Sequence, residues 1–65
     1  MNNKLVYAKD LKPGMVLIKS GYTEIILTVT PDLIDFIGLK FLRPDGTVRR
    51  CSYPIYSLVT IYDPS

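Results

Sequence analysis

The 65-residue sequence contains no histidine, no tryptophan and only one cysteine, Cys51. Histidine is the commonest general base near neutral pH, so neither Cys51 nor any serine has its usual activating partner. A single thiol forms no intramolecular disulfide and cannot supply the soft ligands of a structural zinc site. These absences predict a protein that binds rather than catalyses, without catalytic residues, metal or cofactor.

Long apolar runs are also absent. None approaches the roughly 20 residues needed to cross a bilayer. The first eight residues carry one lysine and are followed at once by Lys9 and Asp10, which is not the pattern of a signal peptide. Together with an unpaired cysteine, this favours a cytoplasmic protein with no membrane contact.

The chain is short and only mildly basic. Its length fits one compact domain, expected over residues 1–65, whose small core would benefit from self-association. The formal net charge is +2, and only Arg49 and Arg50 are adjacent among the eight basic residues. Because affinity for nucleic acid rises with the number of phosphates neutralised, such dispersed charge makes nucleic acid a less favoured partner.

Short runs rich in β-branched, aliphatic and aromatic residues recur about every ten residues, separated by glycine, proline, aspartate and serine. We expect strands at residues 15–19, 24–30, 35–43, 47–53 and 57–62. The segment Thr30-Pro31-Asp32 fits either one turn of helix or a plain turn. This pattern predicts an all-β fold, a small barrel of five to six short antiparallel strands.

The strongest local signal is Arg43-Pro44-Asp45-Gly46-Thr47. Proline, aspartate and glycine in this order suit a type I turn closed by a glycine bulge, which makes a tight hairpin. A three-residue loop then sets Lys40 opposite Arg50 and Phe41 opposite Arg49. One face of this hairpin, with Arg49 at its rim, is expected to line the core: Ile37, Leu39, Phe41, Cys51 and Tyr53.

The other face of the hairpin carries Lys40 and Arg50 side by side. Like charges directly opposed destabilise a sheet, so an anion between them would relieve the repulsion. Alternatively, the two long side chains spread apart in solvent, where salt screens them. Substituting both would abolish anion binding only under the first interpretation.

Tyrosines form a second candidate feature, because aromatic rings interleaved with cations can stack on nucleobases. Tyrosine is also an ordinary strand residue that packs its ring and leaves its hydroxyl in water. The candidate ligand-binding residues are therefore Lys40, Arg49 and Arg50 for charge, with Tyr22, Tyr53 and Tyr56 for stacking.

Two expected strands are apolar on both faces. Since one face of each points outward in a small barrel, we expect Val16, Ile18 and Ile26 to form an exposed interface patch. A homo-oligomer or a protein partner would cover it. Curvature of the barrel or the segment 32–34 would otherwise cover it locally.

The stretch Asp10-Leu11-Lys12-Pro13-Gly14-Met15-Val16-Leu17 resembles the opening of many small SH3-like β-barrels. In these a D-L-x-P-G motif leads into the first long strand, as in the amino-terminal domain of translation elongation factor P and in short bacteriophage proteins. The resemblance implies an SH3-like barrel, a fold that hosts unrelated activities.

A second likeness extends over most of the chain. Leu11-Lys12-Pro13-Gly14, Tyr22, Asp45-Gly46, Tyr53-Pro54 and Ile61-Tyr62-Asp63 follow in the order of similar features in the phage anti-defence proteins that sequester the nucleotide signal of the Thoeris system. Those proteins carry tryptophan at prominent positions, whereas this chain has none. The likeness implies the fold and a nucleotide ligand. We expect a homo-oligomer that sequesters a small anionic, nucleotide-like ligand in a cationic and aromatic pocket at the subunit boundary. The alternatives are a module that inhibits a host protein and a barrel that binds nucleic acid.

Overall fold

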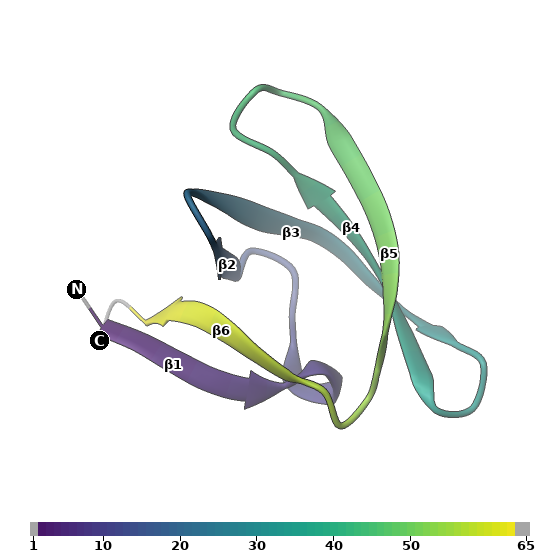
Figure 1. Ribbon diagram of the computed structural model, residues 1–65. Coiled ribbons are helices and arrows are strands. Elements are labelled where there is room, and N and C mark those ends of the chain that lie inside the picture. Colours follow the sequence, from purple (N-terminus) through teal and green to yellow (C-terminus); the bar gives the residue numbers. More distant parts are fainter. Residues whose placement is uncertain (1, 64–65) are drawn as a thin grey trace.

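The computed structural model describes residues 2–63, which form six strands and one short 3₁₀ helix (Figure 1). The elements are β1 (Asn2–Tyr7), η1 (Ala8–Asp10), β2 (Val16–Lys19), β3 (Tyr22–Asp32), β4 (Phe36–Leu42), β5 (Val48–Pro54) and β6 (Leu58–Asp63). The predicted all-β class is confirmed, with six antiparallel strands. Within the described residues, no helix has the length and apolar character needed to span a membrane.

All six strands belong to one sheet, in the order β1-β6-β2-β3-β4-β5. Strands β2 to β5 are sequential neighbours, while β6 returns between β1 and β2. The β2–β6 junction is narrow, because Leu17 and Ile61 are its only paired positions among the described residues. Figure 1 shows that the sheet curves strongly and that β5 leads back to the start of β6 beside β1.

The concave inner face of the sheet holds the core. Leu17, Ile26 and Phe41 are completely or almost completely buried, and they come from three neighbouring strands. The expected core face of the hairpin is confirmed, since Ile37 and Leu39 are buried and Cys51 and Tyr53 pack against them. Strand β6 adds Val59 and Ile61, and the segment before β2 adds Ala8 and Leu11.

The 43–47 hairpin forms as predicted. The amide of Gly46 donates to the Arg43 carbonyl at 2.9 Å, and the amide of Arg43 donates to the Thr47 carbonyl at 2.9 Å. Gly46 has φ +87°, which a glycine adopts without steric cost. The hairpin therefore sets Lys40 opposite Arg50 and Phe41 opposite Arg49.

The prediction that Ile26 is exposed was wrong. Ile26 is 1% exposed and pairs with Phe41 on the inner face, whereas Ile25 is 41% exposed on the outer face. A bulge follows between Ile26 and Thr28, so Val29 returns to the inner face although Ile25 and Leu27 point outward. Both faces of this strand carry apolar side chains, and the face that is buried in the core is the one that also carries Glu24.

Two further segments differ from the sequence-based expectation. Strand β1 lies outside the strands expected from the sequence, although Leu5, Val6 and Tyr7 are strand-forming residues, and it pairs with β6 along its whole length. Strand β3 continues through Pro31 to Asp32, and a turn follows in which Leu33 has φ +50°. Residues 30–32, expected to form a helical turn or a plain turn, are therefore the end of a strand, and the turn lies at residues 33–35.

Candidate functional site

A shallow groove of about 550 Å³ lies on the outer face of β3, β4 and β5. It is lined by Thr28, Thr30, Pro31, Asp32, Gly38, Leu39, Lys40, Arg50, Cys51 and Ser52. Successive cross-strand rows build it: Thr28, Lys40 and Arg50 form one row, and Thr30, Gly38 and Ser52 form the next. We call this surface the outer groove.

Lys40 and Arg50 are the cations of the outer groove. They face each other across β4 and β5, and neither makes an ion pair with a carboxylate of residues 2–63. Three hydroxyl side chains, those of Thr28, Thr30 and Ser52, line the same surface. Two cations beside the hydroxyls of Thr28 and Thr30 are groups that recognise a phosphate or carboxylate, whereas the Ser52 hydroxyl donates to Asp32.

Gly38 forms the floor of the groove. Because it has no side chain, Ser52 on β5 reaches across it and donates a 2.6 Å hydrogen bond to the carboxylate of Asp32 on β3. A Cβ atom at position 38 would lie 3.2 Å from Oγ1 of Thr30. The floor therefore has no side chain of its own at Gly38, and the hydrogen bond between Ser52 and Asp32 crosses it.

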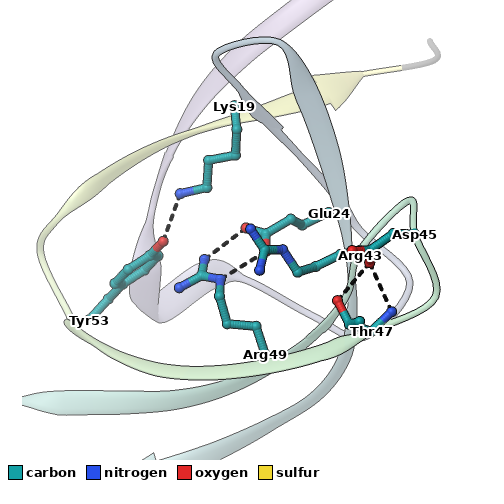
Figure 2. A network of polar contacts seen from close by, with 7 residues as sticks. All are labelled: Lys19, Glu24, Arg43, Asp45, Thr47, Arg49 and Tyr53. Atoms are coloured by element: carbon teal, nitrogen blue, oxygen red, sulfur yellow. Dashed lines mark hydrogen bonds and ion pairs between the residues drawn. The ribbon is translucent and has the colours of Figure 1, made fainter.

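The opposite face of the sheet carries a second polar cluster, centred on the fully buried Glu24 (Figure 2). Arg49 donates two hydrogen bonds to Glu24, from Nε at 2.9 Å and from Nη2 at 2.8 Å. Nε of Arg43 lies 3.8 Å from the same carboxylate. Nearby, Nζ of Lys19 donates to the Tyr53 hydroxyl at 2.9 Å, which links β2 to β5 across the inside of the sheet.

This cluster fixes the ionisation of Glu24. The hydrogen bonds from Arg49 lower the pKa of Glu24 below its usual value, although burial acts in the opposite direction, and the charges of Arg49, Lys19 and Arg43 lower it further. The same hydrogen bonds raise the pKa of Arg49 above its already high value. Glu24 is therefore a carboxylate at neutral pH, and its role is to hold Arg49 against the core.

The structure separates the six predicted ligand-binding residues into three places. Lys40 and Arg50 line the outer groove, as the anion-site hypothesis requires. Arg49, Tyr53 and Tyr22 belong to the inner cluster, where Arg43 lies 5.7 Å from the Tyr22 ring.

Tyr56 lies in neither cluster. Its ring packs edge-on against Tyr7, with centroids 5.9 Å apart, and Lys9 lies 6.0 Å from it. Tyr22, Tyr53 and Tyr56 do not line the outer groove. One chain therefore does not bring Lys40 and Arg50 together with the three tyrosines into a single site for a phosphate and a base.

An aliphatic row crosses the outer face next to the groove. Val16 pairs with Ile25, Ile25 with Leu42, and Leu42 with Val48, so four neighbouring strands each contribute one side chain. Ile25 is 41% exposed and Val48 is 53% exposed. Of the predicted interface residues, Val16 belongs to this row and Ile18 is half-buried on the same face of β2, whereas Ile26 lies in the core.

Sequence reasoning missed the carboxylate and the hydroxyls of the outer groove. The hairpin register places Ser52 opposite Gly38, which could have indicated a position without a side chain on this face of the hairpin. Asp32 was interpreted as a turn residue, and its position depends on the bulge at Leu27, for which the sequence holds no signal. The burial of Glu24 was not predicted either, because a single acidic residue in a strand usually faces solvent.

The sequence matches no protein-family model. It also matches no curated protein. The resemblances to SH3-like barrels and to nucleotide-sequestering phage proteins therefore stay predictions. Within residues 2–63, no three metal-ligating side chains gather into a group that could hold a metal ion.

Proposed function

We propose that this protein binds small phosphate-bearing anions in the outer groove. The observation that carries the proposal is the opposed pair Lys40 and Arg50, two cations without a carboxylate partner in the described chain, beside three hydroxyl side chains. An anion between them removes the like-charge repulsion across β4 and β5 and accepts hydrogen bonds from both. Nucleotides and other phosphate esters belong to this class of ligand.

The test compares two double variants of equal charge. Lys40→Gln/Arg50→Gln removes the cations of the groove, while Lys4→Gln/Lys12→Gln removes two exposed lysines elsewhere. Inorganic phosphate and pyrophosphate are titrated into each protein and followed by amide chemical shifts. We expect the groove variant to bind pyrophosphate at least about tenfold more weakly, corresponding to roughly 1.4 kcal/mol, because it loses charge-assisted hydrogen bonds.

The control variant should stay within about twofold of wild type, because long-range charge is screened at physiological salt. Shifts upon binding should centre on β3, β4 and β5. Equal weakening in both double variants would show that only the overall charge attracts the anion. No binding by wild type would refute the proposal.

A second candidate function concerns the aliphatic row Val16, Ile25, Leu42 and Val48. The row carries no charge, so it is complementary to itself and needs no partner of opposite charge. We propose that a second copy of this chain covers it, which gives a homo-oligomer with the outer groove beside the interface.

A further inference from the structure

Polar groups lie at both ends of the outer groove, and the two ends differ in the sign of their charge. Lys40 and Arg50 occupy one cross-strand row, and the backbone of Asp32 lies two rows further along, opposite Phe36. Its side chain reaches back across Gly38 to the row between, where the carboxylate accepts the hydrogen bond of Ser52. Neighbouring rows on one face lie about 7 Å apart along an antiparallel strand, a spacing that a phosphorylated five-carbon sugar can span.

The carboxylate end selects against some anions. Asp32 repels a second negative group, so an extended anion such as pyrophosphate is not the best fit to the whole groove. The Ser52 bond engages one carboxylate oxygen, Oδ2, and leaves lone pairs of Asp32 to accept further hydrogen bonds. A ligand that fills the groove thus carries an anion at one end and hydrogen-bond donors at the other.

Between the two ends, the floor of the groove has no side chain at Gly38. A side chain at position 38 would occupy the space between Thr30 and Ser52, because its Cβ would lie 3.2 Å from Oγ1 of Thr30. Gly38 needs no positive φ, so conformational freedom does not explain the glycine here. Its effect is to leave room for Ser52 to meet Asp32.

We propose that the ligand of the outer groove is a hydroxyl-bearing phosphate ester, such as a sugar phosphate or the sugar phosphate part of a nucleotide. This inference rests on the proposed anion binding and adds its specificity. The phosphate lies between Lys40 and Arg50, and the sugar hydroxyls donate to Asp32. Thr28 and Thr30 lie along the same wall and supply further hydroxyl partners.

The experiment measures binding of ribose 5-phosphate, inorganic phosphate and phosphoethanolamine by amide chemical shifts, in wild type, Asp32→Asn and Asp35→Asn. Asp35 is exposed and does not line the groove, so its variant reproduces the change of net charge. In wild type we expect ribose 5-phosphate to bind more tightly than inorganic phosphate. Asp32→Asn should weaken ribose 5-phosphate about fivefold, through loss of charged hydrogen bonds, while inorganic phosphate keeps or gains affinity.

Three outcomes would overturn the inference. Equal gains for both phosphates in Asp32→Asn would mean that Asp32 only repels anions, so the hydroxyl end would be refuted while anion binding stands. Tighter binding of phosphoethanolamine than of ribose 5-phosphate, lost in Asp32→Asn, would assign the carboxylate end to an ammonium group. No response of wild type to any phosphate would refute the proposed function itself, and the inference with it.

Discussion

At the scale of single residues, Glu24 is the only polar or charged residue among the buried residues that the structure describes. It is completely buried, and it is satisfied by the two hydrogen bonds of Arg49. No buried side-chain polar atom of the described residues lacks a partner. Removing one member of such a pair leaves the other charge without its counterpart, which costs far more than the pair contributes.

Glu24→Gln should lower the free energy of unfolding by about 2 kcal/mol at pH 7, because the amide nitrogen of glutamine cannot accept a hydrogen bond from Arg49 and the Arg49 charge loses its counterpart. Folding lowers the pKa of Glu24, so below the usual glutamate value of about 4.3 the unfolded chain binds more protons than the native protein. The contribution of Glu24 to the free energy of unfolding is fully present above that pH, and it is lost as the pH falls through the lower pKa that Glu24 has in the folded protein. Urea unfolding at pH 7, 5, 4 and 3 measures this dependence.

In Glu24→Gln this part of the acid sensitivity should disappear. The hydrogen bonds from Thr47 also lower the pKa of Asp45, so a smaller acid-dependent loss persists in the variant. An unchanged pH profile in Glu24→Gln would contradict the assignment of acid sensitivity to this carboxylate.

At the scale of elements, the hairpin of β4 and β5 depends on one backbone conformation. Gly46→Ala should destabilise the protein by about 1–2 kcal/mol, because the φ of +87° places a Cβ against the backbone. Gly46→Asn should recover part of the loss, since asparagine tolerates positive φ better. Thermal unfolding followed by circular dichroism compares the two variants, and equal losses in both would assign the effect to something other than φ.

The same elements show what the sequence could and could not predict. Turn chemistry is local, so Pro44, Asp45 and Gly46 were enough to predict the register and the pairing of Lys40 with Arg50. Strand β1 pairs with β6, a long-range partner that the local sequence does not identify. The buried face of β3 carries Ile26 together with Glu24, whose partner Arg49 is brought to it only by the tertiary fold.

At the scale of the whole molecule, the aliphatic row predicts association. If a second copy covers this row as proposed, Ile25→Glu should shift the homo-oligomer toward monomer in sedimentation velocity and weaken association at least about tenfold, because a carboxylate would be buried in the interface. Ile34→Glu is the matched control, since Ile34 is 92% exposed and outside the row. A wild-type protein that sediments as a monomer at high concentration would contradict the prediction.

The narrow junction between β2 and β6 also bears on how the chain reaches its fold. Strands β2 to β5 pair with sequence neighbours, so their contacts close short loops at small entropic cost. The pairing of β1 with β6 joins the two ends of the described chain, and the single position shared by Leu17 and Ile61 connects that pair to β2. We therefore expect the four-strand meander to form first and β6 to join it later, adding Val59 and Ile61 to the core.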